Sequence, residues 1–151
     1  MRLRHPNPGD RSVLLRLARM MHEESYYRDF TFVESRFDDV LEQCFHNSDW
    51  LALVLEHGDE VIGFFCAVQT EYFFSNDRYA CDLCLYILPE HRGGMGAPRM
   101  VKAFEAWCRI KGVKEMHLGV STEVNAARTA EFYQAMGYHS PAMGFRKKVR
   151  F

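Results

Sequence analysis

The sequence predicts an α/β fold with a central twisted mixed sheet and helices on both of its faces, on the strength of two features. Three consecutive apolar segments, at residues 50–56, 61–74 and 79–88, are separated by short turn-forming sequences, as is typical of antiparallel strands. From Pro89 onward the order changes to a glycine-rich loop, a helix, a strand and a second helix. Because a strand that follows a crossover helix pairs in parallel, we expect both kinds of pairing in one sheet.

The size and composition predict a folded protein without a membrane segment. The 151 residues suffice for one domain with its own core, so we expect a single domain over residues 1–151. A net charge of −1 gives no overall field that would attract nucleic acid or a membrane surface, so we expect neither as a partner. No apolar stretch reaches the roughly 20 residues of a membrane span, and the first residues lack a signal-peptide core. We therefore expect a cytoplasmic protein.

The N-terminal part predicts a short strand and two helices. Residues 2–4 read as the strand, and Asp10 follows a turn in the position of a helix N-cap. The apolar residues after it recur at helical spacing: Val13, Leu14, Leu17, Met20 and Met21. A second helix is expected near Ser35, which forms a possible capping box with Asp38. Its apolar stripe comprises Phe37, Val40, Leu41, Cys44 and Phe45.

The C-terminal part predicts two more helices and two more strands. The helix after the glycine loop has an apolar stripe of Met100, Phe104, Trp107 and Cys108. Gly112 ends this helix, and a strand is expected over residues 114–120. A last helix is expected over residues 125–136, followed by a closing strand near residues 145–149.

The five cysteines favour free thiols, because an odd number in a chain of this size is typical of a reducing compartment. Cys81 and Cys84 have the spacing of half a zinc site. Both fall within a predicted strand, where residues three apart point to opposite faces. We therefore expect buried small side chains here and no metal.

The segment from Ile87 to Arg99 joins a strand to a helix through a loop with three glycines, Gly93, Gly94 and Gly96. Glycines lack the Cβ atoms that would obstruct a ligand, so successive backbone N–H groups can converge on an anion beside the positive end of the helix. This arrangement suits a pyrophosphate. The loop also holds basic or potentially basic side chains: His91, Arg92 and Arg99.

A second pattern lies in the last helix, where an Asn opens the helix and Phe-Tyr precedes a final Gly-aromatic pair. The residues are Asn125, Phe132, Tyr133, Gly137 and Tyr138. Together with the Pro-x-x-Arg-Gly-Gly loop, this pattern resembles the GCN5-related N-acetyltransferase (GNAT) family over roughly residues 79–149. The resemblance implies the acyl-CoA N-acyltransferase fold of that family, in which the strand before the loop splays from its neighbour.

The resemblance also implies acetyl-CoA as cosubstrate, with its thioester arm on the strand and its pyrophosphate on the loop. The implied binding residues are Leu85, Tyr86, Ile87, His91, Arg92, Gly93, Gly94, Met95, Gly96, Ala97 and Asn125. The family's loop pattern starts with Arg or Gln. Counting from Arg92 places Met95 where glycine is usual, whereas counting from His91 matches Gly94 and Gly96; both registers stay open. Asn125 can cap the helix, bind the coenzyme, or do both.

Acyl transfer from a thioester requires a neutral amine, whereas an alkylamine with a pKa of about 10.4 is mostly protonated at pH 7. A base should remove the proton, and the resemblance favours Asp82, with Glu71 as the second candidate. Tyr133 is expected to protonate or hydrogen-bond the departing thiolate, because a phenol with a pKa of about 10 is close to a thiol with one of about 8.5. Ala126 and Ala130 precede Tyr133 at helical spacing, so small side chains should share its face.

The predicted function is acetyl transfer from acetyl-CoA to a primary amine of a small molecule or protein, by direct attack in a ternary complex. Residues 22–28, with Tyr72 and Phe73, are expected to select the acceptor, because carboxylates beside aromatic rings suit a cationic amine. One alternative is another acyl-CoA as donor, and another is a non-catalytic acyl-CoA-binding or regulatory domain. A third alternative is a nucleic-acid-binding module, because basic residues alternate onto one face of the predicted closing strand: Arg146, Lys148 and Arg150. A homodimer is the base-rate expectation.

Overall fold

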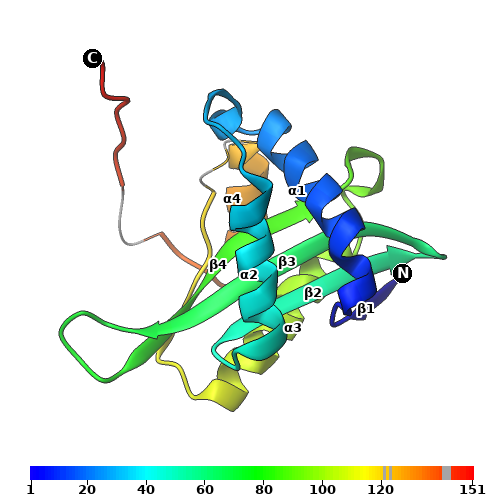
Figure 1. Ribbon diagram of the computed structural model, residues 1–151. Coiled ribbons are helices and arrows are strands. Elements are labelled where there is room, and N and C mark those ends of the chain that lie inside the picture. Colours follow the sequence, from blue (N-terminus) through cyan, green and yellow to red (C-terminus); the bar gives the residue numbers. More distant parts are fainter. Residues whose placement is uncertain (121, 123, 141–143) are drawn as a thin grey trace.

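The computed structural model describes residues 1–120, 122, 124–140 and 144–151. The described strands are β1 (Arg2–Arg4), β2 (Trp50–His57), β3 (Glu60–Glu71), β4 (Arg78–Ile87) and β5 (Glu115–His117). The described α-helices are α1 (Arg11–Glu24), α2 (Glu34–His46), α3 (Gly96–Lys111) and α4 (Ala126–Ala135) (Figure 1). Short 3₁₀ turns are η1 (Pro8–Asp10), η2 (Tyr26–Asp29) and η3 (Pro89–His91).

The strands form one mixed sheet in the order β1-β2-β3-β4-β5. The first four pair antiparallel, and β4 pairs parallel with β5, which confirms the predicted combination. The parallel ladder is short, running from Tyr79 opposite Glu115 to Cys81 opposite His117. β4 continues to Ile87, so its later residues lie beyond the pairing with β5.

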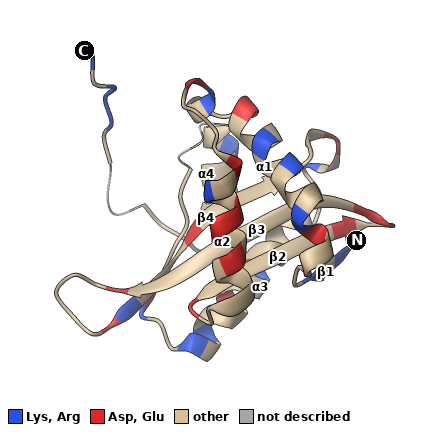
Figure 2. Ribbon diagram, in the orientation of Figure 1, with Lys and Arg blue, Asp and Glu red and all other residues tan. Residues whose placement is uncertain are grey.

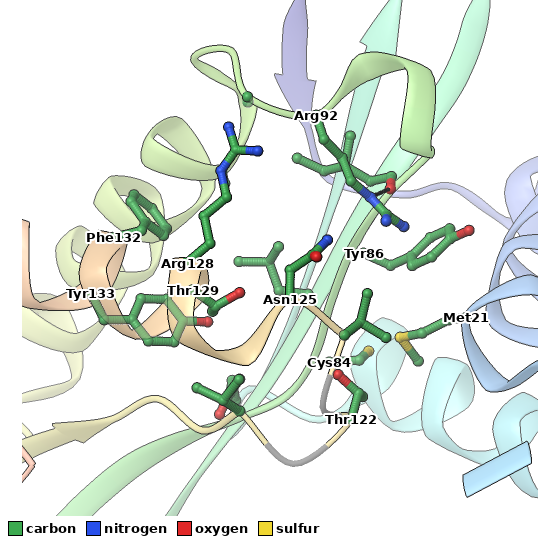
Figure 3. A pocket seen from close by; sticks show the side chains of 18 of the residues that line it. Met21, Cys84, Tyr86, Arg92, Thr122, Asn125, Arg128, Thr129, Phe132 and Tyr133 are labelled. Atoms are coloured by element: carbon green, nitrogen blue, oxygen red, sulfur yellow. Dashed lines mark hydrogen bonds between the residues drawn. The ribbon is translucent and has the colours of Figure 1, made fainter. Parts of the chain in front are cut away.

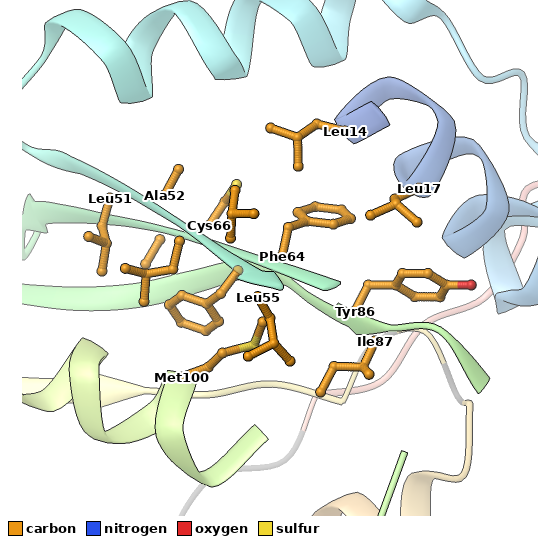
Figure 4. Close-up of a cluster of buried hydrophobic side chains, with 14 of the residues drawn as sticks. Leu14, Leu17, Leu51, Ala52, Leu55, Phe64, Cys66, Tyr86, Ile87 and Met100 are labelled. Carbon is orange, nitrogen blue, oxygen red and sulfur yellow. The ribbon is translucent and has the colours of Figure 1, made fainter. Parts of the chain in front are cut away.

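Both faces of the sheet are covered by helices, α1 and α2 on one side and α3 and α4 on the other (Figure 1). Neighbouring residues of β3 enter the two cores alternately. The Phe64 ring lies 5.8 Å from that of Phe37 in α2, and the Phe65 ring lies 5.3 Å from that of Phe104 in α3. Figure 4 shows the two layers, with Phe64 on one side of the sheet and Met100 on the other.

A β-bulge in β4 determines where Asp82 points. The pairing register with β3 shifts between Cys66 and Ala67, which leaves Leu83 as the extra residue. Asp82 lies opposite Ala67 and therefore shares the face of Ala67 and Phe65. Without the bulge, simple alternation would turn Asp82 toward α1 and α2. The bulge instead turns it toward α3 and α4.

The same bulge overturns the prediction for the two cysteines of β4. Cys81 lies opposite Val68 and Cys84 opposite Cys66, two residues apart on β3, so both cysteines fall on one face. The prediction of opposite faces was wrong because it assumed an unbroken strand. All five cysteines are free, and no group of three His, Cys, Asp or Glu residues suited to a metal occurs in the described part of the chain.

Two helix starts differ from the predictions. Asp10 is the N-cap of α1 but makes no cap bond there. Its carboxylate instead accepts hydrogen bonds from Arg4 at 2.7 and 2.9 Å. α2 begins at Glu34 without a side-chain cap, so Ser35 already lies inside the helix and the predicted capping box with Asp38 does not form.

The predicted closing strand is absent, since residues 144–151 contain no strand. Phe145 and Val149 are 90% and 75% exposed. Their alternation fits a strand, but a strand also needs a partner for its backbone N–H and C=O groups. The basic residues near the C-terminus therefore form no sheet face, which removes the basis of the nucleic-acid alternative. The predicted strand over residues 114–120 is likewise shorter, as β5 shows.

Charges on the α1–α2 face are mixed. Figure 2 shows a basic α1 beside a largely acidic α2. Arg11 pairs with Asp38 and Glu42, and Arg19 pairs with Glu34 at 2.6 Å. Across the described residues, the helices are all too short or too polar to cross a bilayer.

Candidate active site

A pocket of about 350 Å³ opens between β4, the glycine loop and α4 (Figure 3). Its position follows from the sheet, because the pairing of β4 with β5 ends at Cys81 and His117 and α4 then crosses near the open edge. The volume is in the usual range for small-molecule sites, roughly 300–1,000 Å³.

Nearly all the residues predicted for the site line this pocket. They are Asp82, Leu85, Tyr86, Ile87, His91, Arg92, Gly93, Gly94, Gly96, Ala97, Asn125 and Tyr133. Met95 does not line it, and its side chain is 63% exposed. Glu71 is exposed at the end of β3, Tyr72 bonds Glu115, and Phe73 is fully exposed. The β3–β4 hairpin therefore contributes neither the second base candidate nor acceptor contacts to the pocket.

The loop leads directly into α3, which begins at Gly96 and has no side-chain N-cap bond. The first N–H groups of a helix have no partner within the helix. Among the described residues, the backbone N–H groups of residues 93–97 have no loop or side-chain acceptor. These donors, together with the positive end of the 16-residue helix, are available to an anion.

The three glycines of the loop differ in backbone conformation and in the space that a side chain would find. Gly93 has φ +88°, a left-handed conformation that favours glycine. A Cβ on Gly96 would lie 2.7 Å from Leu55 Cδ2 and 3.2 Å from Ile87 Cδ1, so this glycine allows α3 to pack closely on the sheet. A Cβ on Gly94 would meet nothing closer than 3.9 Å. Gly94 is therefore the one glycine of the three that neither backbone conformation nor packing requires, and the space beside it stays open.

Arg92 is engaged by an acidic residue of α1. Its Nη1 and Nη2 atoms donate to the two carboxylate oxygens of Glu24 at 2.5 and 2.9 Å, and its Nε donates to the Ile87 carbonyl at 2.7 Å. The Tyr86 hydroxyl donates to the same carboxylate at 3.3 Å. The bond with Arg92 lowers the pKa of Glu24, so the pair is ionised at neutral pH. Sixty-eight positions separate the two residues, and no sequence pattern linked them.

Asp82 is half-buried and has an unusual acidity. Burial raises the pKa of its carboxyl to about 6, although the carboxylate accepts a hydrogen bond from the Gly119 N–H at 3.0 Å that acts in the opposite direction. A carboxyl with this pKa can both accept and release a proton near neutral pH, as a general base requires.

Tyr133 is 7% exposed and lies at the pocket wall. Burial, and secondarily the charge of Asp82, raises the pKa of its phenol. The phenol therefore stays protonated and can donate a hydrogen bond. The near match of phenol and thiol acidity expected from reference values does not hold, which favours hydrogen bonding over full proton transfer.

The face of α4 that meets the pocket differs from the predicted one. Ala126 and Ala130, expected on the face of Tyr133, do not line the pocket, whereas Tyr133 does. The other residues here that line it follow the helical spacing i, i+3, i+4 and i+7: Asn125, Arg128, Thr129 and Phe132. The same periodicity, counted from Asn125, would have identified Arg128.

Asn125 occupies the N-cap position of α4 but makes no side-chain cap bond. Its backbone is left-handed, with φ 48° and ψ 46°, a conformation that Asn adopts more readily than most residues. Its side chain projects into the pocket in Figure 3. Capping therefore does not account for this residue.

The segment predicted to select the acceptor reaches the pocket through Glu24, which lines it, and adjoins it through Tyr26. The Tyr26 N–H donates to the Thr122 carbonyl at 2.8 Å, and Thr122 lines the pocket. The guanidinium of Arg146 lies over the ring of Tyr26, with its central carbon 3.6 Å from the ring centroid. The carboxylate of Glu24 is already held by Arg92.

A model of the Acetyltransferase (GNAT) family matches residues 17–138. The chain belongs to the GNAT family of acetyltransferases. The match extends from α1 through α4 and includes the pocket, the glycine loop and the divergence of β4 from β5. A comparison with curated proteins gave no match.

Solved structures of GNAT acetyltransferases share the fold. A GNAT family acetyltransferase of Staphylococcus aureus subsp. aureus USA300_TCH1516 has a TM-score of 0.65 and 19% identity, with 98% of each chain covered. The aminoglycoside 6'-N-acetyltransferase AAC(6')-IG of Acinetobacter haemolyticus has a TM-score of 0.73 and 15% identity, with 99% of this chain and 100% of that one covered. AAC(6')-Iy, bound to a CoA-containing bisubstrate analogue, has a TM-score of 0.72 and 18% identity, with 99% of this chain and 98% of that one covered. The mixed sheet with helices on both faces is thus the GNAT fold.

Proposed function

We propose that this protein transfers an acetyl group from acetyl-CoA to a primary amine by direct attack in a ternary complex. One observation carries the proposal: the pocket lies where β4 leaves β5, between an open strand edge and a glycine loop with free N–H groups. These two features match the two chemically different parts of an acyl-CoA, its amide-bearing arm and its pyrophosphate.

The open edge of β4 would hold the amide-bearing arm. Residues 83–87 line the pocket beyond the last pair of β4 with β5. An extended ligand can hydrogen-bond to such an edge as an additional strand does. The arm would then point its thioester along β4 toward Asp82 and Tyr133, which line the same pocket.

The loop would hold the pyrophosphate. The N–H groups of residues 93–97 and the positive end of α3 supply donors and partial charge without any side chain. Gly94 leaves room for the ligand to approach this backbone.

Asp82 would receive the proton of the ammonium form, directly or through a water molecule. The neutral amine then attacks the thioester carbonyl, a C–N bond forms, and the C–S bond breaks as the tetrahedral intermediate collapses. Tyr133 would donate a hydrogen bond to the departing thiolate, whose charge develops only as the C–S bond breaks. As the intermediate collapses, the nitrogen loses its second proton, which goes to the departing sulfur, and Asp82 later releases its own proton to solvent. The products are an amide and free coenzyme A.

A small-molecule amine is the acceptor class that the comparisons support best. Two of the structures with this fold are named as aminoglycoside acetyltransferases, and aminoglycosides are polyamines. Their identities of 15% concern the fold alone, so the acceptor has to be found by assay. The panel should include aminoglycosides, short polyamines and lysine-containing peptides.

The test is amine-dependent release of free thiol from acetyl-CoA, with mass spectrometry of the acetylated product. Transfer to at least one amine, abolished or strongly slowed in Asp82→Asn, is the expected result. Coenzyme binding without turnover on any amine would instead identify a non-catalytic acyl-CoA-binding domain. Faster turnover with a longer acyl-CoA would correct the donor.

A further inference from the structure

Three arginines border the glycine loop: Arg92, Arg99 and Arg128. Two of them are engaged by the protein itself. Arg92 is held by Glu24, and Nη1 of Arg99 donates to the Met1 carbonyl at 2.7 Å. Arg128 is exposed and lines the pocket, and within the described part of the chain it has no hydrogen-bond or ion-pair partner.

Arg128 lies over the loop. A Cβ added to Gly93 would come within 3.2 Å of its Nη2 atom, so the guanidinium occupies the bare side of this glycine. Figure 3 shows Arg128 rising from α4 toward the loop, whereas Arg92 turns away toward Tyr86. The guanidinium and the unpaired N–H groups of residues 93–97 thus border the same space.

Arg92 is poorly suited to the same task. To reach a phosphate it would have to break its two bonds to Glu24 and the bond from Nε to the Ile87 carbonyl. Glu24 also lines the pocket, so its carboxylate would be left unpaired near a ligand of the same charge, which is unfavourable. The intact pair is neutral and ties the loop to α1.

We propose that Arg128 binds the pyrophosphate of the coenzyme, and that Arg92 and Glu24 act together as a neutral clamp that positions the loop. This assignment rests on the proposed use of an acyl-CoA and identifies which arginine supplies the charge. It differs from the sequence-based expectation, which placed Arg92 in contact with the coenzyme and gave Arg128 no role.

The test measures the dissociation constants of coenzyme A and dephospho-coenzyme A by calorimetry at low and high salt. Arg128→Gln should weaken binding of both ligands by about 10- to 100-fold at low salt, the usual size of a charge-assisted hydrogen bond. The loss should shrink at high salt, where exposed charges are screened. Arg99→Gln is the matched control, since it removes a nearby guanidinium outside the pocket lining, and it should change affinity by less than about threefold.

The double variant Glu24→Gln/Arg92→Gln tests the clamp without changing the net charge. It should lower the melting temperature and weaken coenzyme binding less than Arg128→Gln does. A larger loss of affinity in the double variant than in Arg128→Gln would assign the phosphate contact to Arg92 and overturn the proposal.

The remaining outcomes separate this inference from the proposed function. If the wild-type protein binds neither ligand, the acyl-CoA function fails. If it binds coenzyme A and Arg128→Gln binds equally well, only the assignment of Arg128 fails. A loss confined to coenzyme A, with dephospho-coenzyme A unaffected, would contradict the pyrophosphate contact and move Arg128 to the 3′-phosphate.

Discussion

The carboxylate of Asp82 accepts a hydrogen bond from the backbone N–H of Gly119 at 3.0 Å. This bond joins β4 to the segment after β5, just beyond the last pair of the two strands at Cys81 and His117. Asp82 reaches this position because the bulge at Leu83 turns it toward α3 and α4. The carboxylate of Asp82 therefore links the two segments where their pairing ends, and it lies half-buried at the pocket.

The acidity of Asp82 predicts the pH dependence of the reaction. With a pKa of about 6, the carboxyl is increasingly ionised, and able to accept a proton, as pH rises through this value. The kcat/KM for a fixed amine should therefore rise through about pH 6, and Asp82→Asn should lose this limb along with most activity. Steady-state rates from pH 5 to about 8 measure the profile. An unchanged limb in the variant would assign the ionisation to another group.

The same pKa predicts an effect on stability. The folded-state pKa of about 6 lies above the ordinary value of 3.8, so the folded protein binds more protons between these values. Asp82 therefore contributes most to the free energy of unfolding below about pH 4, and this contribution is lost as pH rises through about 6. Asp82→Asn, which keeps an oxygen acceptor for Gly119, should raise the melting temperature at pH 7 more than at pH 4. Equal shifts at both values would contradict the raised pKa.

Tyr133→Phe should slow turnover without weakening coenzyme binding. The variant keeps the buried ring and removes only the hydroxyl, which acts on charge that develops as the C–S bond breaks. A decrease in kcat of about 100-fold is expected, with an unchanged dissociation constant for acetyl-CoA. Wild-type turnover in Tyr133→Phe, with chemistry shown to be rate-limiting, would leave Tyr133 as a packing residue.

Gly94 and Gly96 should respond differently to substitution. Gly96→Ala places a methyl group against Leu55 and Ile87, and overpacking of this kind costs about 1–3 kcal/mol of the free energy of unfolding. Gly94→Val meets no protein atom closely but narrows the approach to the loop, so it should weaken coenzyme binding with little change in melting temperature. Thermal denaturation and coenzyme titration of both variants distinguish the two roles.

The sequence predicted the elements of this fold better than their contacts. Hydrophobic periodicity placed α1 to α3, apolar segments between turn sequences placed β2 to β4, and the start and stop signals of the late helix placed α4. The residues predicted in the glycine loop and the late helix line one pocket. Alternation could not reveal the bulge at Leu83, because an extra residue leaves the same apolar pattern. It also suggested a strand near residues 145–149, since it records which side chains alternate and not whether a partner edge exists.

The pairing of Glu24 with Arg92 lay outside the reach of sequence reasoning for a different reason. α1 and the glycine loop meet only because both pack near the end of β4, and no local pattern encodes that meeting. The sequence therefore assigned Arg92 to the ligand by its place in the loop. In the structure its guanidinium is paired with the carboxylate of Glu24.

Thermal denaturation with and without acetyl-CoA tests the central claim most directly. A ligand at one hundred times its dissociation constant adds about 2.7 kcal/mol to the free energy of unfolding, which should raise the melting temperature of a protein of this size by about 5–10 °C. The rise should be much smaller in Gly94→Val at the same acetyl-CoA concentration. A cooperative transition that does not move at millimolar acetyl-CoA would contradict an acyl-CoA site between β4 and the glycine loop.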